Sequence, residues 1–353
     1  MAKDIKTYHE QTFIEDTLRL REILTTLPAF AKDYFRAMEP TTSAKTRISY
    51  AYDIRTFFYF LVECNPLYRD RSTTQFTLED LDQLSSVDIE EYLEYLKVYE
   101  SSENKQITNS EQGLARKMSA LRSFYGYFFK RQAIEKNPTL LVDMPKLHEK
   151  AIIRLDTDEV AILLDYIETC GSQLTGQKKV YYEKTKYRDL AIITLLLGTG
   201  IRVSECVGID ISNLDFETNG MKIHRKGGAD VILYFGEEVR EALLDYLEER
   251  EKIIPKEGSE NALFLSMQKR RISVRAVENL VKKYARPVTP LKTITPHKLR
   301  STYGTQLYQE TGDIYLVADV LGHKDVNTTR KHYAAMEDQR RRMAAGKIQL
   351  REK

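Results

Sequence analysis

Apolar residues recur at helical spacing over three long segments in the first half of the chain. These segments predict helices over Thr41–Glu63, Ser86–Tyr99 and Ser110–Gln132. The first opens with hydroxyl residues that cap helices, and the third ends before Asn137-Pro138, because the residue ahead of a proline disfavours the α region. The second is acidic and is expected to face water, whereas the other two carry basic residues beside their apolar stripes. The first half is therefore predicted to be a helical domain.

The hydrophobic pattern breaks down at a short charged segment near the middle of the chain. Between Asp143 and Arg154 no apolar period remains, which indicates a linker. Helical signals return at Asp156 or Thr157, both typical N-cap residues, and continue to about Thr169. The chain is therefore divided into an N-terminal extension (1–24), a helical domain (25–147), a linker (148–155) and a second domain (156–353).

The second domain mixes helices with a small amount of strand. The lysine-rich stretch 178–186 is predicted to be a polar loop, and the apolar run Arg188–Leu197 a buried helix that Gly198-Thr-Gly200 ends. The apolar period then changes to two on either side of a glycine turn, which predicts a β-hairpin from Met221 to Phe235. The remaining elements are expected to be a helix over Glu237–Lys252, a brief strand over Leu263–Leu265, helices over Ser273–Tyr284, His297–Gln309, Ile314–Leu321 and Asn327–Tyr333, and an amphipathic tail over Met336–Lys353. The predicted fold class is mainly α with a small β-hairpin or sheet (α+β).

The composition narrows the class of protein. Of 353 residues, 42% are hydrophobic and 30% charged, which favours a globular chain over a disordered one. No apolar stretch approaches the roughly 20 residues that span a bilayer, and the amino terminus lacks the apolar core of a signal peptide. We therefore expect a cytoplasmic protein without a membrane partner. Cys64, Cys170 and Cys206 are too few and too irregularly spaced for a disulfide framework or a zinc site.

Several side chains of the second domain stand out by their chemistry, although each is a weak signal alone. Arg202 and Glu205, one helical turn apart, are typical of a surface ion pair. His297 and Arg300 share one face of a helix that Pro296 begins, which is equally typical of a solvated surface. What distinguishes these residues is that they belong to an ordered series. The series runs through Arg202, Lys226, His297, Arg300, His323 and Tyr333.

This series resembles the tyrosine recombinase and integrase family, most closely its Xer-type and conjugative-element members. The matching motifs are Gly200-Ile-Arg202-Val-Ser-Glu205, Arg225-Lys226-Gly227-Gly228, Thr295-Pro-His297-Lys-Leu-Arg300 and Leu321-Gly-His323-Lys-Asp-Val-Asn-Thr-Thr-Arg-Lys-His-Tyr333. Together they cover the second half of the chain. In the first half, Leu114–Phe129 and Asn137-Pro138 are similar to the helical core-binding domain of the family. Ser301 stands where relatives often carry a second histidine, and Tyr333 lies one residue farther from Leu321-Gly-His323 than in many of them.

The resemblance implies an enzyme that cuts and rejoins DNA without metal, cofactor or ATP. Tyr333 would attack phosphorus, leaving a 3′-phosphotyrosyl link and a free 5′-hydroxyl. Arg202 and Arg300 would clamp the transition state, because a planar guanidinium forms bidentate, charge-assisted hydrogen bonds with phosphate. His297 and His323 would hydrogen-bond the phosphate, and His297 would also help deprotonate the tyrosine.

Two further roles follow from the same resemblance. Lys226, in the turn of the predicted hairpin, would act as the general acid that protonates the departing 5′-oxygen. Glu205 would orient nearby groups without taking part in the reaction. A phenol has a pKa of about 10, so the surrounding cations must activate Tyr333.

The architecture of the family implies a C-shaped clamp around a double-stranded DNA recombination site. Four protomers would form a homotetramer on two DNA sites, exchange strands through a Holliday junction and pass a C-terminal helix, Met336–Lys353, between neighbours. Xer-like chromosome dimer resolution is favoured, because no arm-binding domain is evident ahead of the helical domain. The alternatives are an integrase or excisionase of a mobile element, a type IB topoisomerase-like enzyme and a catalytically silent DNA-binding protein.

The net charge at first argues against a nucleic-acid partner. The chain has 54 basic and 52 acidic residues, a formal net charge of only +2. The charges are segregated, however, because residues 269–300 hold ten Lys or Arg and one acid, whereas residues 88–103 hold six acids and one lysine. This predicts a basic surface for DNA and acidic surfaces elsewhere. In the helical domain, the candidate DNA contacts are Lys45, Arg47, Arg116, Lys117 and Arg122.

Overall fold

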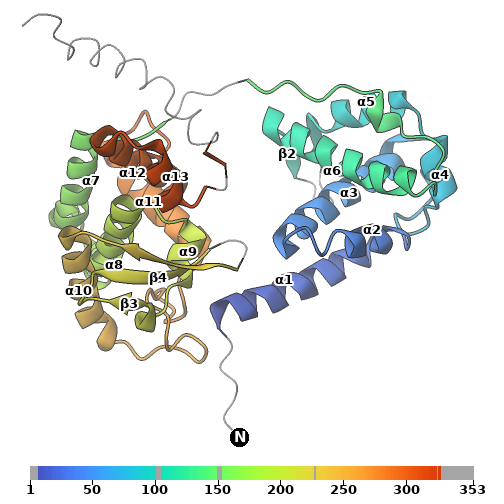
Figure 1. Cartoon of the computed structure of the whole chain (residues 1–353). Coiled ribbons are helices and arrows are strands. Elements are labelled where there is room, and N and C mark those ends of the chain that lie inside the picture. Colours follow the sequence, from blue (N-terminus) through green and yellow to red (C-terminus); the bar gives the residue numbers. More distant parts are fainter. Residues whose placement is uncertain (1–6, 101–104, 149–152, 226–227, 324, 327–353) are drawn as a thin grey trace, which may run out of the picture. The chain divides into compact units, whose positions relative to one another are not determined.

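The computed structural model describes residues 7–100, 105–148, 153–225, 228–323 and 325–326. Four predictions lie outside these ranges: the helices over Asn327–Tyr333 and Met336–Lys353, and the candidate residues Lys226 and Tyr333. The chain divides into two compact units, Met1–Lys150 and Ala151–Lys353, which are described separately (Figure 1).

The first unit is built from helices around an aromatic core. Its elements are α1 (Tyr8–Leu24), α2 (Ala31–Ala37), α3 (Ala44–Cys64), α4 (Leu78–Gln83), α5 (Ser86–Tyr95), β1 (Val98–Glu100), β2 (Gln106–Thr108), α6 (Glu111–Lys130) and the short 3-10 helix η1 (Pro138–Leu140). Aromatic rings from different helices meet edge to face. The centroids of Phe57 and Tyr92 are 5.1 Å apart, and those of Tyr34 and Phe124 are 5.2 Å apart. Because such rings bury large apolar areas, they hold α2, α3, α5 and α6 together.

Local capping explains where the two long helices of this unit begin. The Ser43 Oγ accepts a hydrogen bond from the backbone N–H of Thr46 at 3.3 Å, and Ser110 caps α6 in the same way. The helix predicted over Ser86–Tyr99 ends earlier, at Tyr95, because the chain enters β1 and pairs antiparallel with β2. α1 begins with a capping box between Thr7 and Glu10 and has no counterpart among the predicted helices.

The second unit is a layer of helices with one small sheet. Its elements are α7 (Thr157–Thr169), η2 (Cys170–Gln173), α8 (Gly176–Thr199), α9 (Val203–Gly208), η3 (Ile211–Asn213), β3 (Leu214–Asp215), β4 (Gly220–His224), β5 (Asp230–Tyr234), α10 (Glu237–Glu251), α11 (Val274–Val288), α12 (Pro296–Thr311) and α13 (Ile314–Leu321). α8 packs against α7, α10 and α12, and its residues 191–197 are buried (Figure 1). In the described part of the chain, no helix combines the length and apolar character that a bilayer span requires.

The first half of α8 corrects the sequence-based prediction. Residues 178–186 were expected to form a polar loop, but they lie within the helix. Tyr182 and Thr185 are buried, and the Tyr182 hydroxyl donates to the Ile167 carbonyl at 3.0 Å. The four lysines of this stretch are good helix formers that point mainly to solvent, so their polarity conceals the helix.

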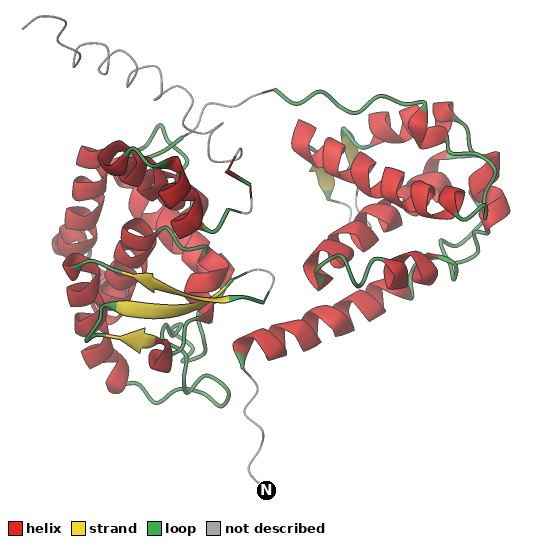
Figure 2. Ribbon diagram, in the orientation of Figure 1, coloured by secondary structure: helices red, strands yellow, loops and turns green. Residues whose placement is uncertain are grey.

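The predicted β-hairpin is confirmed as strands β4 and β5. β4 pairs antiparallel with β5, with Lys222 opposite Ile232, and β3 adds to the other edge of β4 (Figure 2). β5 is the outer strand, and its Ile232 and Tyr234 are exposed. The brief strand predicted over Leu263–Leu265 is wrong in extent, because only an isolated bridge joins Leu265 to Arg271.

Candidate active site

Guanidinium groups from three different elements meet at the C-terminal end of α13. The last carbonyls of a helix have no N–H partner within the helix and must be satisfied from outside. The C-cap of α13 is Gly322, which has a φ of +61°, and the next residue is His323. The carbonyls of residues 319–322 accept hydrogen bonds from the side chains of Arg202, Arg225 and Arg300.

Arg202 is held in place by Glu205. It is the N-cap of α9, and its backbone N–H donates to Glu205 Oε2 at 2.8 Å. Its side-chain Nη1 donates to Glu205 Oε1 at 2.8 Å, and its Nη2 donates to the Gly322 carbonyl at 3.1 Å. The Glu205 side chain is only 4% exposed, whereas that of Arg202 is 32% exposed. The buried carboxylate therefore orients a guanidinium that still reaches solvent.

Arg300 connects the ends of two helices. From α12, its Nη1 donates to the Gly200 carbonyl at 2.6 Å and its Nη2 donates to the Leu321 carbonyl. Gly200 is the C-cap of α8 and has a φ of +62°, a conformation that favours glycine. A Cβ at this position would lie 2.4 Å from Tyr303 Cδ1 and 2.9 Å from Leu321 Cδ2. Glycine is therefore required both by the backbone and by the close approach of α12 and α13.

Arg225 completes the cluster from the end of β4. Its Nη1 donates to the Asp319 carbonyl at 3.1 Å and its Nη2 donates to the Val320 carbonyl at 2.6 Å. A Cβ on Gly322 would come within 2.5 Å of Arg225 Nη1. Arg225 was not among the predicted site residues, because in this motif only the neighbouring Lys226 has a side chain that matches a catalytic role. Its function as a helix cap depends on α13, which is distant in sequence.

The two candidate histidines lie at the ends of the same two helices. His297 is exposed in the first turn of α12, directly after Pro296, and one helical turn before Arg300. His323 is half-buried and directly follows Gly322. The structure therefore gathers Arg202 and Arg300 at the turn that leads into His323, and it places His297 on the face of α12 that carries Arg300.

The cluster carries an excess of positive charge. Three guanidinium groups are opposed, among the contacts just described, by the Glu205 carboxylate and by the C-terminal dipole of α13. The dipole is equivalent to roughly half a negative charge. An anion with several acceptor oxygens is the ligand that such a site favours, and phosphate has the geometry that guanidinium groups recognise.

The candidate DNA contacts of the first unit fall into two groups. Arg47 and Lys117 are buried and paired, Arg47 with Glu39 at 3.1 Å and Lys117 with Asp53 at 3.1 Å. Their positions argue against a direct contact with DNA, because a buried, paired charge has no access to a phosphate. The sequence could not reveal this burial, since Asp53 lies on α3 and Lys117 on α6.

The other three candidates differ in how they are held. Arg116 is also paired with Asp53, but its side chain is 48% exposed. Arg122 donates to the carbonyls of Thr139 and Val142, so it fastens the segment that follows α6. Lys45 is exposed in the first turn of α3, where a phosphate could reach it.

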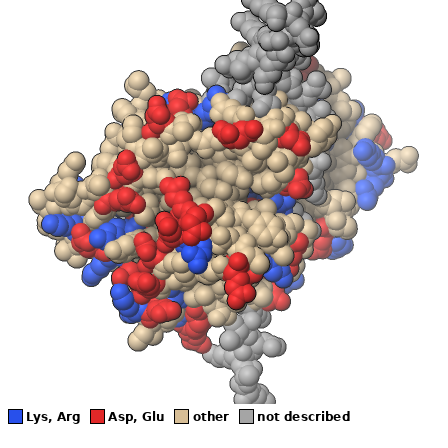
Figure 3. All heavy atoms as spheres, turned by 60° about the vertical axis from the view of Figure 1, so that its left-hand side comes forward, with Lys and Arg blue, Asp and Glu red and all other residues tan. Residues whose placement is uncertain are grey.

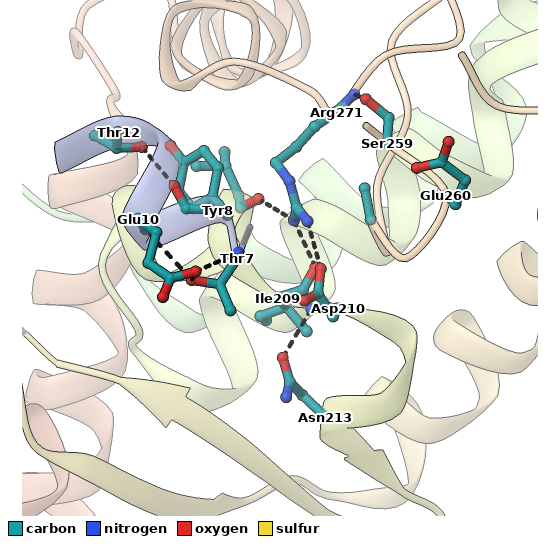
Figure 4. Close-up of polar contacts among 12 residues, drawn as sticks. Thr7, Tyr8, Glu10, Thr12, Ile209, Asp210, Asn213, Ser259, Glu260 and Arg271 are labelled. Atoms are coloured by element: carbon teal, nitrogen blue, oxygen red, sulfur yellow. Dashed lines mark hydrogen bonds and ion pairs between the residues drawn. The ribbon is translucent and has the colours of Figure 1, made fainter. Parts of the chain in front are cut away.

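Not all of the basic segment 269–300 contributes to an exposed surface. Arg271 is directed inward, and its Nη1 donates to the carbonyls of Val207 and Ile209 at 3.0 and 2.9 Å. Its Nη2 pairs with Asp210, whose backbone N–H donates to Asn213 (Figure 4). Arg275, by contrast, is 71% exposed. On the face of the molecule shown in Figure 3, acidic and basic side chains are intermingled.

Known proteins are similar to this chain in both sequence and fold. The model of the phage integrase family matches residues 154–340. The tyrosine recombinase XerC of Caldanaerobacter subterraneus subsp. tengcongensis is 34% identical over 326 residues, which are 90% of this chain and 85% of that protein. XerC of Chlorobaculum tepidum is 30% identical over 296 residues, covering 81% of this chain and 84% of the relative.

Solved structures show the same fold at lower identity. The XerH site-specific recombinase, bound to its difH substrate in a pre-cleavage complex, has a TM-score of 0.62 at 19% identity, covering 88% of this chain and 82% of that chain. The Tn1549 transposon integrase in complex with circular intermediate DNA has a TM-score of 0.58 at 20% identity, covering 85% of this chain and 93% of that chain.

The chain therefore belongs to the phage integrase family of tyrosine recombinases, enzymes that cleave and rejoin DNA strands without metal or ATP. Similarity to Xer recombinases extends over most of its length. The resemblance inferred from the ordered motifs is thus confirmed at the level of the family.

Proposed function

We propose that this recombinase acts at one DNA site present in two copies and resolves chromosome dimers in the manner of Xer enzymes. The proposal rests on the sequence similarity of the chain to proteins named XerC. The XerC of Caldanaerobacter subterraneus subsp. tengcongensis is 34% identical to it over 90% of this chain. Four protomers would bind two sites as a tetramer and exchange strands through a Holliday junction. Residues 336–353 would pass between neighbours as the exchanged helix, and the two units would enclose the duplex.

The observation that carries the catalytic proposal is the convergence of Arg202 and Arg300 beside His323. The two guanidinium groups donate to the carbonyls of Gly322 and Leu321, which are consecutive residues. Groups anchored in this way need little reorganisation when negative charge builds on the phosphate that is being cleaved. They would therefore stabilise the transition state more than the ground state, with His323 donating a further hydrogen bond.

The reaction itself requires a nucleophile and two proton transfers. The Tyr333 Oη would form a bond to phosphorus while the bond from phosphorus to the 5′-oxygen breaks. The phenol proton would pass to His297, and the Lys226 ammonium would give a proton to the departing 5′-oxygen. The product is a 3′-phosphotyrosine and a 5′-hydroxyl. The attack of another strand's 5′-hydroxyl on this linkage reverses the same steps, so no energy source is needed.

A nicked suicide substrate tests the nucleophile. Cleavage next to the nick releases a short fragment, which traps the covalent complex. Tyr333→Phe should bind the DNA in a gel-shift assay but form no adduct resistant to denaturation. Tyr315→Phe is the matched control, because Tyr315 is 72% exposed on α13 and should keep normal adduct formation. Persistent adduct in Tyr333→Phe would contradict the assignment.

A plasmid with two directly repeated sites tests the proposed role. Recombination yields two smaller circles, whereas a type IB topoisomerase-like enzyme only relaxes supercoils. Relaxation of a plasmid with one site, without circles from the two-site plasmid, would overturn the proposal. Binding without either product would indicate a silent DNA-binding protein.

A further inference from the structure

The backbone of Arg225 closes the turn of the β4–β5 hairpin. Its N–H donates to the Ala229 carbonyl at 2.9 Å, and its carbonyl accepts from the Gly228 N–H at 3.1 Å. Gly228 and Ala229, on the far side of the turn, are therefore both hydrogen-bonded to this one residue. Any constraint on the Arg225 side chain is transmitted to the turn through its own backbone.

The side chain of Arg225 supplies such a constraint by contacting α13. Its two Nη atoms donate to the carbonyls of Asp319 and Val320 at 3.1 and 2.6 Å. The planar fork bridges two consecutive carbonyls, so it fixes both distance and orientation. A lysine, with a single ammonium, could not reproduce this bridge.

The hairpin has little else to fix it on its outer side. β5 is the edge strand of a three-stranded sheet, and its Ile232 and Tyr234 are 63% and 67% exposed. Edge strands with exposed residues gain little from core packing. The contact between Arg225 and α13 is therefore a specific tether for this end of the hairpin.

The Arg225 guanidinium packs tightly against the backbone of Gly322. The Arg225 guanidinium lies where a side chain on Gly322 would begin, since a Cβ there would be 2.6 Å from Arg225 Cζ. The Arg225 Nε is buried, and within the described part of the chain it has no hydrogen-bond partner. Burying an unpaired N–H costs stability. The side chain is thus held against α13 at some cost, which is typical of a residue placed for function rather than for stability.

We propose that Arg225 is a positioning residue, which anchors the end of β4 to the C-terminal end of α13 and so sets the general acid for its proton transfer. This inference rests on the proposed function, in which Lys226 protonates the departing 5′-oxygen. Because its backbone closes the turn and its two Nη atoms contact α13, Arg225 acts on the general acid through the turn. It links the group that protonates the leaving strand to the helix end that holds Arg202 and Arg300.

A change of leaving group distinguishes a misplaced general acid from damage to the fold or to the phosphate clamp. A substrate with sulfur in place of the bridging 5′-oxygen releases a thiolate, which needs no general acid because a thiol has a pKa near 8.5. A variant that only misplaces the general acid should cleave this substrate normally. A variant with a weakened phosphate clamp or a distorted fold should be impaired on both substrates.

The variant to measure is Arg225→Met, which keeps the aliphatic stem and removes the guanidinium. On the oxygen substrate, we expect single-turnover cleavage to fall by about tenfold or more, because general acids contribute about 100-fold or more. On the sulfur substrate, its rate should return to within about threefold of the wild type, as should that of Lys226→Ala. Arg225→Lys should be intermediate on the oxygen substrate. Arg240→Ala, on α10 and paired with Glu237, is the matched control and should match the wild type on both.

The outcomes distinguish the two proposals. If the wild type cleaves neither substrate, the proposed function fails. If the wild type is active and Arg225→Met is unimpaired on oxygen, or equally impaired on oxygen and sulfur, the positioning role fails. Circular dichroism and melting temperatures of each variant identify a fold defect. If Arg225→Met does not fold, the cleavage rates of Arg225→Lys on the oxygen and sulfur substrates test the positioning role instead.

Discussion

Arg202 and Arg300 come from different helices, yet their side chains donate to the carbonyls of consecutive residues, Gly322 and Leu321. The end of α13 thus serves as a common anchor for two cations that would otherwise repel one another. Their relative position is fixed before any ligand arrives. This is the arrangement that electrostatic stabilisation of a transition state requires.

Replacing Glu205 should weaken catalysis more than DNA binding. Glu205→Gln keeps an oxygen for the backbone N–H of Arg202 but removes the charge that pairs with its guanidinium. Loss of one charge-assisted contact costs about 1.5–3 kcal/mol, so we expect single-turnover cleavage to fall by roughly ten- to a hundredfold. Quench-flow cleavage assays and gel shifts measure the two effects. A larger loss of DNA affinity than of cleavage rate would contradict this role.

Gly200→Ala should destabilise the second unit beyond the effect of backbone strain. The new Cβ would meet the Tyr303 ring and Leu321, and overpacking of this kind costs about 1–3 kcal/mol. Gly176→Ala is the control, because Gly176 also has a positive φ but open space around it, so only strain of about 1 kcal/mol remains. Urea denaturation of both variants gives the difference. Equal destabilisation would show that α12 and α13 do not crowd this position.

Removing Lys117 should strongly destabilise the first unit. Lys117 and Asp53 are both buried, and burial raises the pKa of Asp53 despite the opposing effects of Lys117 and Arg116. Loss of one partner of a buried pair costs about 3–5 kcal/mol, so Lys117→Met should lower the free energy of unfolding by about that amount. The double variant Asp53→Asn, Lys117→Met should recover part of it. Additive losses in a double-mutant cycle would mean that the pair is not coupled.

The carboxyl of Asp230 should titrate below its usual range. Hydrogen bonds from Lys222 and then from His224, each at 2.7 Å, lower the pKa of Asp230 below 3.8. Because the pKa of Asp230 is lower in the folded protein, its hydrogen bonds stabilise the hairpin at pH values above the unfolded-state pKa. This contribution is lost as the pH falls through the folded-state pKa. Carbon-detected NMR titration measures the midpoint. Lys222→Ala should move it up toward 3.8, and an unchanged midpoint would refute the cause.

Thiol reactivity should separate the three cysteines. Cys64 is exposed, whereas Cys170 and Cys206 are buried, and burial raises the pKa of Cys206 to about 12. Since the thiolate is the reactive form, the native protein should show one fast thiol toward a disulfide reagent and two more after unfolding. Cys64→Ser should abolish the fast phase. A fast phase that persists would place another thiol at the surface.

Much of the fold could be predicted from the sequence where apolar periodicity was clear. The helices at α3, α6, α7, α10 and α13, and the hairpin of β4 and β5, follow directly from that pattern. The first half of α8 was missed because its exposed lysines outnumber the buried Tyr182 and Thr185. Short elements such as β1 depend on pairing with another strand, which no local pattern encodes.

The site was only partly predictable. The order of the motifs can be read from the sequence, whereas the contacts between their side chains depend on the fold. The motifs singled out Arg202 and Arg300, which do meet in the structure. The role of Arg225 depends on carbonyls of α13 that any residue type could supply. Likewise, the burial of Lys117 depends on Asp53 from another helix, so its charge alone suggested a surface contact.

Leu155, near the start of the second unit, is attached directly to the helix that carries Arg300. The Leu155 N–H donates to the Thr302 Oγ1 at 3.0 Å, and Leu155 is buried. Thr302 lies in the same turn of α12 as Arg300. A displacement of Leu155 would therefore pull directly on the turn of α12 that carries one of the clamping arginines.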